Sequence, residues 1–297
     1  MPPLKVLITG GSGLLGQYLN IEFSKHFDIL TLNNSVIGNV KSFNNQSVDI
    51  TDFRKLKIIF EGFRPDVVFH TAGISNVQIA DTLTPSEVFN INVKSTENIA
   101  QLCDKFNSKL FYTSTDLVYA GYRGSMLKEE SKLIPLSLYA ETKLMGEIKI
   151  QETLGNFVIL RTALLFGYGL PPRTNFFQQM VIDLKGGKVV NLFTDQFRTP
   201  LSLAEAASFS VELIKRNISG EIINFGGAER ISRYELGEMV CELLKIDKQL
   251  LNPITMDQIP GVPIVTDVSM DTSKLRSFGI KQLSLQKSIQ NVLSQFN

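Results

Sequence analysis

The chain has little of the residue types that build disulfide frameworks and metal centres. Its 297 residues contain two cysteines, Cys103 and Cys241, and two histidines, His26 and His70. Both cysteines fall in apolar, helix-like segments, which favours two buried free thiols in a reducing compartment over a disulfide. Because the two histidines are far apart in the sequence, we expect no metal site.

The chain also lacks an excess of charge of either sign and any long apolar run. Its 30 basic and 29 acidic residues leave a formal net charge of +1, which gives no electrostatic support for a nucleic-acid or membrane partner. No apolar stretch approaches the roughly 20 residues that cross a bilayer, and the first apolar run is too short for a signal peptide. We therefore expect a cytoplasmic protein.

A glycine-rich turn near the start, Thr9-Gly10-Gly11-Ser12-Gly13-Leu14-Leu15-Gly16, is the most informative segment that is present. It follows an apolar run that predicts a buried strand, and it precedes a helical pattern. In that context the first glycine makes a tight turn, the second lets the backbone approach a pyrophosphate and the third allows close packing of helix on strand. The helix N-terminus then faces the phosphates. The turn predicts a dinucleotide site, although its spacing is Gly-x-x-Gly-x-x-Gly rather than the commoner Gly-x-Gly-x-x-Gly.

Short apolar runs alternate with helical patterns over the first half of the chain. This alternation indicates right-handed strand-helix-strand units and a parallel sheet covered on both faces. Ligands of such sheets bind at the carboxyl ends of the strands. We predict strands over Leu4–Thr9, Asp28–Leu32, Val67–Thr71, Lys109–Thr113 and Phe157–Arg161, and helices over Leu14–Lys25, Asp52–Phe60, Pro85–Phe106 and Leu138–Thr153.

The alternation ends near Gly167. Residues 168–200 are rich in glycine, proline and polar residues, with one helical pattern at Phe176–Leu184. Later helices are predicted over Leu203–Lys215 and Ser232–Leu244, and a short strand over Glu221–Phe225. We therefore expect a dinucleotide-binding domain over residues 1–167. Residues 168–297 should be mainly a smaller substrate-binding lobe, with some later segments returning to the first domain.

Tyr139 and Lys143 stand four residues apart in a predicted helix, so they share one of its faces. A phenol has a pKa near 10, and a neighbouring ammonium is expected to lower the pKa of Tyr139 until the hydroxyl exchanges a proton near neutral pH. Ser114-Thr115-Asp116 ends a predicted strand and brings hydroxyls to the same cleft, where one holds a carbonyl oxygen. The pair by itself is also typical of an exposed helix surface, but its combination with the glycine turn favours catalysis.

These motifs resemble the extended short-chain dehydrogenase/reductase family over essentially the whole chain. The resemblance implies an α/β, Rossmann-type doubly wound parallel sheet with a smaller C-terminal substrate-binding lobe. It also implies an NAD(P)-dependent oxidoreductase. The matching segments include Asp49-Ile50, His70-Thr71-Ala72-Gly73, Asn92-Val93 with Thr96 and Asn98, Arg161-Thr162 and Phe166-Gly167.

Within this family, three later segments resemble the reductases that act on dTDP-linked 4-keto sugars in carbohydrate biosynthesis. They are Asp195-Gln196-Phe197 with Pro200, Ser232-Arg233-Tyr234-Glu235 and Asp271-Thr272-Ser273-Lys274-Leu275. The resemblance implies that a nicotinamide provides a hydride to the keto group of a nucleotide sugar. A small-molecule nucleotide sugar is thus the expected partner, and a homodimer is left open.

Site residues follow from the resemblance, position by position. Tyr139 is implied as the general acid that protonates the keto oxygen, Lys143 as the residue that binds the nicotinamide ribose and tunes Tyr139, and Thr115 as the hydrogen-bond donor to that oxygen. Asn175 is implied to contact the substrate diphosphate. The implied cofactor-binding residues are Gly10, Ser12, Gly13, Leu14, Leu15, Asn33, Asp49, Ile50, Thr71, Ala72 and Gly73, together with Tyr139 and Lys143.

Four of the matched residues have simpler interpretations. Asp49 is also suited to cap the helix that begins near Asp52, and Asn175 to cap the following helix. His70 is better explained as a packed strand residue than as a catalyst. Asn92 is either an ordinary polar residue of a helix or, as the resemblance implies, the backbone link to water in a proton relay.

The chain departs from the family pattern at three places. The second strand ends in Leu32-Asn33-Asn34-Ser35, without the acidic residue that accepts bonds from an NAD ribose and repels a 2′-phosphate, which favours NADP(H) over NAD(H). The stretch 263–267 lacks the arginine that meets substrate phosphates in related reductases, which leaves Arg173 and Arg198 as substitutes. Leu117 stands where related 4,6-dehydratases carry a glutamate base.

Two other functions stay open at this stage. An epimerase of the same family would keep its nicotinamide bound and show no net oxidation. A non-catalytic NAD(P)-binding subunit, like the regulatory partner of methionine adenosyltransferase, would bind the cofactor without turnover. The intact Thr115, Tyr139 and Lys143 set favours the reductase over this second alternative.

Overall fold

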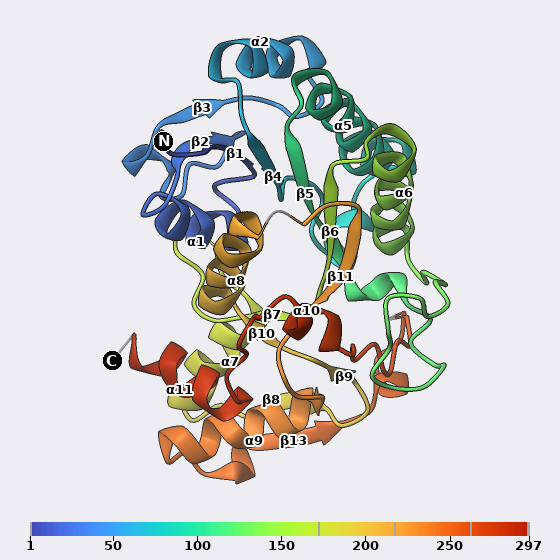
Figure 1. Cartoon of the computed structure of the whole chain (residues 1–297). Helices are drawn as coiled ribbons and strands as arrows, with labels where there is room; N and C mark the ends of the chain where they lie inside the picture. The colour runs from blue at the N-terminus through green and yellow to red at the C-terminus, as the bar shows by residue number, and fades with distance from the viewer. Residues whose placement is uncertain (1, 172, 217, 262, 296–297) are drawn as a thin grey trace.

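In the computed structural model, which describes residues 2–171, 173–216, 218–261 and 263–295, one large parallel sheet dominates the fold (Figure 1). Among these residues it has seven strands in the order β11–β6–β5–β4–β1–β2–β3, so the predicted doubly wound sheet is confirmed. The order reverses between β1 and β4, which opens a crevice at their carboxyl ends. The strands are β1 (Lys5–Thr9), β2 (Asp28–Asn33), β3 (Asn45–Ser47), β4 (Val67–His70), β5 (Lys109–Thr115), β6 (Phe157–Thr162) and β11 (Glu221–Phe225).

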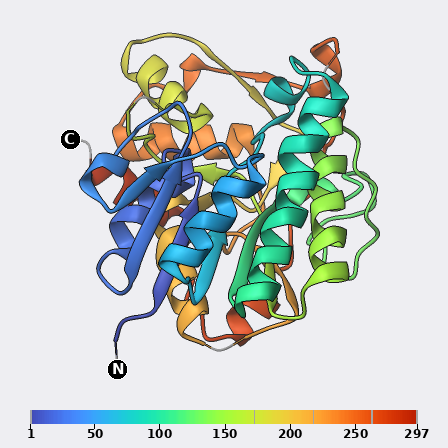
Figure 2. The same ribbon diagram turned by 90° about the horizontal axis from the view of Figure 1, so that it is seen from above.

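Helices cover both faces of this sheet because alternate strand residues point to opposite sides. Val6 and Ile8 of β1 pack with α1 (Leu14–Phe23) and α8 (Leu203–Lys215). Leu7 packs on the other side with α2 (Phe53–Phe63), α5 (Ser95–Phe106) and α6 (Leu138–Thr153). Figure 2 shows these last three helices side by side. The near-continuous apolar runs of the strands therefore reflect burial on two faces.

The predicted helix 85–106 has a wider turn in its middle. Helix α4 (Pro85–Phe89) continues through a π-helical segment, Asn90–Lys94, into α5. Two hydroxyls just after this segment donate to carbonyls four residues earlier, Ser95 to Ile91 and Thr96 to Asn92, the latter at 2.7 Å. This widening accompanies an inward position of the Asn92 side chain, which is buried.

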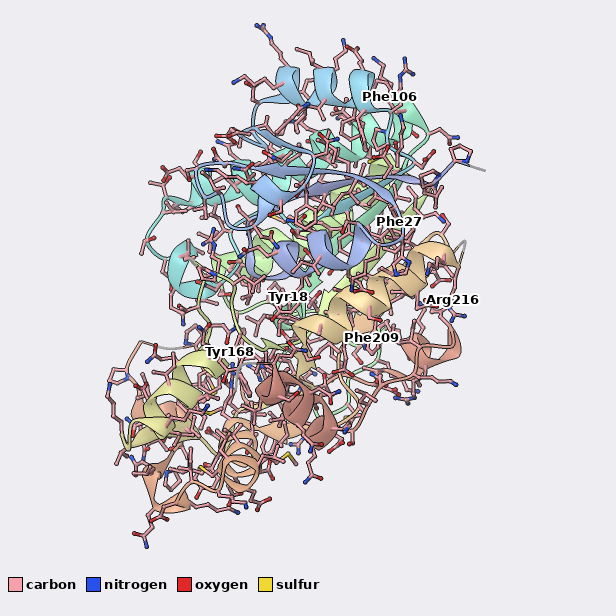
Figure 3. The ribbon with its side chains drawn as sticks, turned by 90° about the vertical axis from the view of Figure 1, so that its left-hand side faces the viewer. Tyr18, Phe27, Phe106, Tyr168, Phe209 and Arg216 are labelled. Carbon is pink, nitrogen blue, oxygen red and sulfur yellow. The ribbon has the colours of Figure 1, made fainter. Side chains whose placement is uncertain are left out.

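Part of the chain beyond Gly167 returns to the large sheet. Strand β11 pairs in parallel with β6 along its whole length, and α8 packs against α1. In Figure 3, α1 with Tyr18 lies along α8 with Phe209. The short helix α10 (Ser273–Ser277) lies on β11, where Lys274 Nζ donates to the Ile222 carbonyl at 2.7 Å. The division of the fold therefore does not follow a single point in the sequence.

The remaining C-terminal segments form a smaller lobe with its own apolar core, which includes Phe177, Leu192, Leu236 and Ile289. Tyr18 Oη donates to the Tyr168 carbonyl at 2.8 Å and ties α1 to the segment that enters this lobe. The lobe and its connections contain α7 (Phe176–Lys185), α9 (Arg233–Leu244), α11 (Leu285–Ser294) and the strand pairs β7 (Leu165–Phe166) with β10 (Leu201–Ser202), β8 (Val190–Phe193) with β13 (Leu251–Ile254) and β9 (Phe197–Arg198) with β12 (Ile231–Ser232).

Both cysteines are free and buried, as predicted, Cys103 beneath the sheet and Cys241 in the lobe. In the described ranges, no helix is long and apolar enough to cross a membrane. The same ranges hold no cluster of three or more His, Cys, Asp or Glu side chains suited to a metal ion.

A buried ion pair joins α6 to the carboxyl ends of β5 and β6. The Glu147 carboxylate accepts from Arg161 Nη2 at 2.9 Å and from its Nε at 3.2 Å, and Ser114 Oγ donates to the same carboxylate at 2.5 Å. Arg161 Nη1 also donates to Tyr119 Oη at 3.1 Å. Both charged side chains are almost fully buried, so each depends on the other for compensation of its charge.

Removal of the Glu147 carboxylate is expected to destabilise the fold strongly. In Glu147→Ala, Arg161 would stay charged and buried without its partner, so the free energy of unfolding should fall by about 3–5 kcal/mol. The matched control is Glu152→Ala on the same helix, whose carboxylate pairs with Lys149 at the surface and should change stability by less than about 1 kcal/mol. Urea unfolding measures both values, and equal losses would contradict the assignment.

A buried histidine joins β1, β4 and α5 beneath the crevice. His70 Nδ1 lies 2.7 Å from Thr9 Oγ1, and Nε2 lies 3.1 Å from Thr96 Oγ1. Burial, together with the Lys143 charge, lowers the pKa of His70 to about 3. The ring is therefore neutral at neutral pH, and the interpretation of His70 as a packed strand residue is confirmed.

This lowered pKa predicts an acid-dependent loss of stability. Between about pH 6.5 and pH 3, His70 is protonated in the unfolded chain but not in the folded chain. As the pH is lowered through this range, the free energy of unfolding should therefore decrease by up to about 1.4 kcal/mol per pH unit. In His70→Gln that contribution is absent, and the slope between pH 6 and pH 4 should be shallower. Because the variant also loses hydrogen bonds at every pH, the slope and not the level is compared. Parallel curves would refute the neutral, buried ring.

Candidate active site

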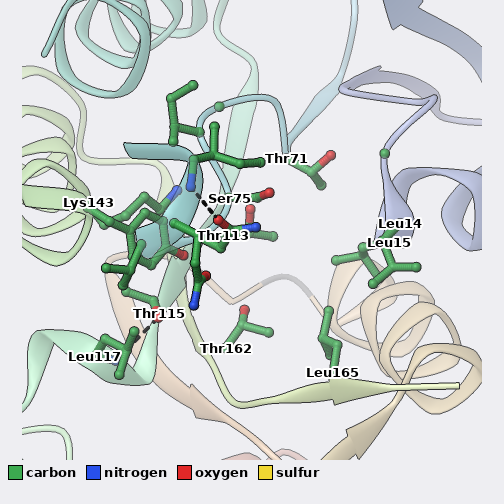
Figure 4. A pocket seen from close by; sticks show the side chains of 18 of the residues that line it. Leu14, Leu15, Thr71, Ser75, Thr113, Thr115, Leu117, Lys143, Thr162 and Leu165 are labelled. Atoms are coloured by element: carbon green, nitrogen blue, oxygen red, sulfur yellow. Dashed lines mark hydrogen bonds between the residues drawn. The ribbon is translucent and has the colours of Figure 1, made fainter. Parts of the chain in front are cut away.

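A large cavity lies at the carboxyl ends of the strands, between the sheet and the smaller lobe. Its volume of about 1720 Å³ exceeds the range of about 300–1,000 Å³ that is usual for one small ligand. It extends from the glycine turn, past the ends of β4 and β5, to residues of the lobe such as Phe176 and Arg233. Figure 4 shows Leu14 and Leu15 on one side of it and Thr115 and Lys143 on the other. The cavity therefore has room for a dinucleotide and a second ligand.

Glycine is required at two positions of the turn for steric reasons. Gly10 has a φ of +72°, and a Cβ there would lie 2.7 Å from the Ala72 nitrogen. A Cβ on Gly16 would lie 2.1 Å from the Gly10 carbonyl oxygen. Gly13 is the N-cap of α1 and provides no side-chain acceptor. The first N–H groups of α1 are thus left for an external anion, as a phosphate site needs.

The residues implied for cofactor binding all line this one cavity. Asn33 folds back onto its own loop, because its Nδ2 donates to the carbonyls of Asn34 and Val36 at 2.9 and 3.1 Å. Thr71 Oγ1 donates to the Thr9 carbonyl at 2.7 Å. The implied cofactor-binding residues that line the cavity are Gly10, Ser12, Gly13, Leu14, Leu15, Asn33, Asp49, Ile50, Thr71, Ala72, Gly73, Tyr139 and Lys143.

The capping alternative for Asp49 is wrong. The N-cap of α2 is Asp52, whose side chain accepts from the Lys55 nitrogen. Asp49 instead accepts from the backbone nitrogen and the hydroxyl of Thr51 at 2.9 and 2.8 Å, in the turn that precedes the cap. It stays exposed at the rim of the cavity.

Thr115 and Tyr139 come together where β5 ends and α6 begins. Ser137 caps α6 through a bond from the Ala140 nitrogen at 3.2 Å, which fixes Tyr139 in the first turn. The Thr115 hydroxyl lies close enough to the Tyr139 phenol to lower its pKa. Lys143 follows one turn later, and its Nζ lies 4.1 Å from the centroid of the Tyr112 ring. All three implied catalytic side chains therefore face the same cavity.

The expected effect of Lys143 on Tyr139 is wrong for this structure. Burial raises the pKa of Tyr139 to about 12, opposed by the nearby Thr115 hydroxyl. Burial lowers the pKa of Lys143 to about 7, opposed by the charge of Glu147. Desolvation outweighs the neighbouring charge, and the ammonium lies over Tyr112. The phenol therefore stays protonated at neutral pH, the state in which it donates a proton.

Asn92 connects two elements that border the cavity. Its Oδ1 accepts from the Ile74 nitrogen at 2.8 Å, and its Nδ2 donates to Thr142 Oγ1 at 3.1 Å. It thus joins the loop after β4 to α6 and is not an ordinary exposed helix residue. Its carbonyl accepts from Thr96, and a part for that carbonyl in a proton relay stays a prediction.

Asn175 caps α7, as the simpler interpretation predicted. Its Oδ1 accepts from the Gln178 nitrogen at 3.0 Å, and its Nδ2 donates to the Gly167 carbonyl at 2.8 Å. Both ends of the amide are therefore engaged. The residue does line the cavity, and its contact with a diphosphate stays a prediction.

Three charged residues of the cavity wall were not expected as a group. Asp116 follows Thr115 and is buried, and Arg198 Nε lies 3.7 Å from its Oδ2. Burial raises the pKa of Asp116, opposed by the charges of Arg198 and Arg233. The sequence signals were present, since Asp116 ends the Ser-Thr-Asp segment and Arg233 belongs to a later matched segment, but nothing local showed that they meet.

Comparison with known proteins adds to this geometry. The family described as "RmlD substrate binding domain" matches residues 4–297. A dTDP-4-dehydrorhamnose reductase from Aggregatibacter actinomycetemcomitans is 26% identical, covering 97% of this chain and 98% of that protein. Methionine adenosyltransferase 2 subunit beta from Xenopus laevis is 26% identical, covering 95% of this chain and 84% of that protein.

Solved structures share the fold. The crystal structure of dTDP-4-dehydrorhamnose reductase from Bacillus anthracis, in complex with NADP, has a TM-score of 0.87 and 22% identity, covering 99% of this chain and 100% of that one. Since the family match spans nearly every residue and the fold is the one that the sequence implied, the chain belongs to the RmlD substrate-binding domain family of extended short-chain dehydrogenase/reductase proteins.

Proposed function

We propose that the chain is a nicotinamide-dependent reductase of a 4-keto nucleotide sugar, with dTDP-4-dehydrorhamnose as the first substrate to test. One observation carries the proposal: the neighbouring hydroxyls of Thr115 and Tyr139 lie in the same cavity as the glycine turn. The names of the matched reductases, one of them solved with NADP, support the substrate class and the cofactor.

The chain's own residues provide the acid half of this reaction. A nicotinamide, when bound, supplies the hydride that adds to the carbonyl carbon. Tyr139 donates its phenol proton to the carbonyl oxygen, so that C=O becomes CH–OH, and the Thr115 hydroxyl holds that oxygen in place. The raised pKa of Tyr139, about 12, keeps the proton available at neutral pH.

Lys143 restores the proton balance in this proposal. Its pKa of about 7 leaves a large fraction of ammonium at neutral pH, and it lies one helical turn from Tyr139. Over the Tyr112 ring the ammonium is held by cation–π attraction and by the charge of Glu147. A ribose hydroxyl is a stronger partner, so we propose that Lys143 turns toward the nicotinamide ribose when cofactor binds.

NADP(H) is the proposed preferred form of the cofactor. Strand β2 ends at Asn33, and Asn34 follows it along the cavity. No carboxylate stands at this point to accept bonds from an unphosphorylated ribose or to repel a 2′-phosphate. The neutral amides of Asn33 and Asn34 do not repel an unphosphorylated ribose either, so activity with NAD(H) is also compatible with this site.

Dehydratase chemistry does not fit the cavity wall. Leu117 occupies the position where a base is needed, and its side chain packs against the apolar groups that include Tyr139 and Val118. A leucine cannot remove a proton. An epimerase of the same family stays an alternative, and retained cofactor without net oxidation would distinguish it.

A second candidate function rests on the match to methionine adenosyltransferase 2 subunit beta. A regulatory subunit would use the same cavity to bind NAD(P) without turnover. Co-purification with a methionine adenosyltransferase, together with no turnover on any 4-keto nucleotide sugar, would favour it. A cytoplasmic location and a homodimer stay predictions, and gel filtration of the purified chain tests the latter.

Loss of the phenol hydroxyl should abolish reduction but not cofactor binding. In Tyr139→Phe we expect kcat to fall at least about 100-fold, because the general acid is gone, while NADPH binding is retained. Absorbance of NADPH with dTDP-4-dehydrorhamnose measures turnover, and fluorescence titration measures binding. Tyr122→Phe, an exposed tyrosine outside this cavity, is the matched control. Full turnover in Tyr139→Phe would overturn the proposed role.

A further inference from the structure

The wall of the cavity beside Thr115 has more positive charge than negative charge, carried by a buried Arg198 and a half-buried Arg233. Asp116 provides one negative charge, and Arg198 and Arg233 provide two positive charges that both act on it. The nearby Asp267 also acts on Arg198, but its carboxylate is paired with a third arginine, Arg230, at 2.7 Å, so the positive excess remains. An uncompensated buried charge is costly, so this wall is suited to an anionic ligand.

Arg198 has little left to offer such a ligand. Its Nη1 donates to the Phe197 carbonyl at 2.6 Å, and its Nη2 donates to the Val265 carbonyl at 3.2 Å. Its Nε lies toward Asp116. The guanidinium therefore fastens residues 265–266, the very stretch that lacks the arginine of related reductases. Arg173, the other substitute that the sequence suggested, donates through Nε to the Ser12 carbonyl and so lies at the glycine turn.

Arg233 differs because its guanidinium is held in place while two of its three nitrogens have no hydrogen-bond acceptor among the described residues. It is the first residue of α9, and its Nε donates to Gln196 Oε1 at 2.9 Å. Its guanidinium carbon lies 4.4 Å from the centroid of the Phe176 ring. Nη1 is shielded from solvent and has no hydrogen-bond partner in the described part of the chain. Nη2 also makes no hydrogen bond to the described residues, and unlike Nη1 it is not fully shielded from solvent.

The neighbours of Arg233 orient it in advance. The Gln196 amide nitrogen contacts Met256 Sδ at 3.7 Å, which turns the amide oxygen toward Arg233. The aromatic face and the amide leave the guanidinium few alternative positions. A planar donor group that is fixed before the ligand arrives loses little entropy on binding. Such a group binds a phosphate through two parallel hydrogen bonds.

We propose that Arg233 binds the diphosphate of the nucleotide sugar and takes the place of the arginine that residues 263–267 lack. This inference rests on the proposed function. Asp116, next to Thr115 in the chain, lies 3.7 Å from Arg198 and is close enough to Arg233 for their charges to interact, so a diphosphate held by Arg233 would lie near the hydroxyls that receive the keto group. In a nucleotide sugar whose 4-keto sugar is uncharged, the diphosphate is the group that carries fixed negative charge. We therefore assign a phosphate, and not a carboxylate, to this position.

Binding of dTDP, dTMP and thymidine to the purified full chain tests this assignment by calorimetry. In Arg233→Gln we expect dTDP to bind at least about tenfold more weakly, because a charge-assisted contact is lost. Thymidine binding and NADPH binding should not change. Arg233→Lys keeps the charge but not the planar fork and should recover part of the affinity. Arg123→Gln, which replaces an exposed arginine outside the cavity lining, is the matched control and should bind dTDP like the unaltered chain.

The outcomes separate this inference from the function on which it rests. If the unaltered chain binds dTDP and Arg233→Gln binds it equally well, the role of Arg233 is wrong and the reductase proposal stands. If Arg233→Gln loses thymidine or NADPH affinity to the same extent as dTDP affinity, the substitution disturbs the lobe and the phosphate contact is refuted. If the unaltered chain binds NADPH but no nucleoside diphosphate (UDP included), the nucleotide-sugar proposal itself fails, and the inference with it.

Discussion

The buried pair of Glu147 and Arg161 is the interaction on which the candidate site depends most. Tyr139, Lys143 and Glu147 follow one another at intervals of four residues, so they share the face of α6 that meets the sheet. The Glu147 carboxylate binds Arg161 of β6 and Ser114 of β5. Ser114 and Thr115 are consecutive, so the bond to Ser114 sets the position of α6 relative to Thr115. One ion pair thereby fixes the distance between the hydroxyls that would act on a carbonyl.

Burial, and not the nearest charge, sets the proton affinities in this cavity. Desolvation disfavours the charged form of each group, so it raises the pKa of Tyr139 and lowers that of Lys143. The phenol is kept as an acid and the amine is brought near neutrality. This arrangement suits a residue that must give a proton and a neighbour that returns one. A tyrosine beside a lysine on an exposed helix would have neither property.

The smaller lobe brings to the cavity a charge pattern that differs from the sequence expectation. Arg198 donates hydrogen bonds to the carbonyls of residues 265–266. Arg233 is held in a fixed orientation, and its Nη1 has no hydrogen-bond acceptor among the described residues. Phe176, Gln196 and Met256 come from three separate segments of the lobe, and together they hold Arg233. The lobe therefore brings fixed positive charge to the cavity, and Asp116 from the large sheet opposes it.

The sequence by itself determined the elements whose signals are local. The helices 138–153 and 203–215 and the strand 221–225 have the predicted ends, because apolar periodicity and capping residues such as Ser137 and Ser202 lie inside the element or next to it. The glycine turn is a local signal in the same way, because its spacing lies within one short segment, although the clash that requires glycine at position 10 comes from Thr71 and Ala72 after β4. Ser284, the cap of α11, is a similar local signal, although α11 lies outside the predicted helices.

Only the tertiary structure decided what depends on segments that are distant in the sequence. Strands of two to four residues, such as β9 and β12, exist because a partner strand pairs with them. The widened turn at Asn90–Lys94 depends on hydroxyl bonds and packing that no periodicity encodes. The pKa values of Tyr139 and Lys143, and the meeting of Asp116 with Arg198 and Arg233, follow from burial. Burial is a property of the packed chain, so no local pattern of residues could have given it.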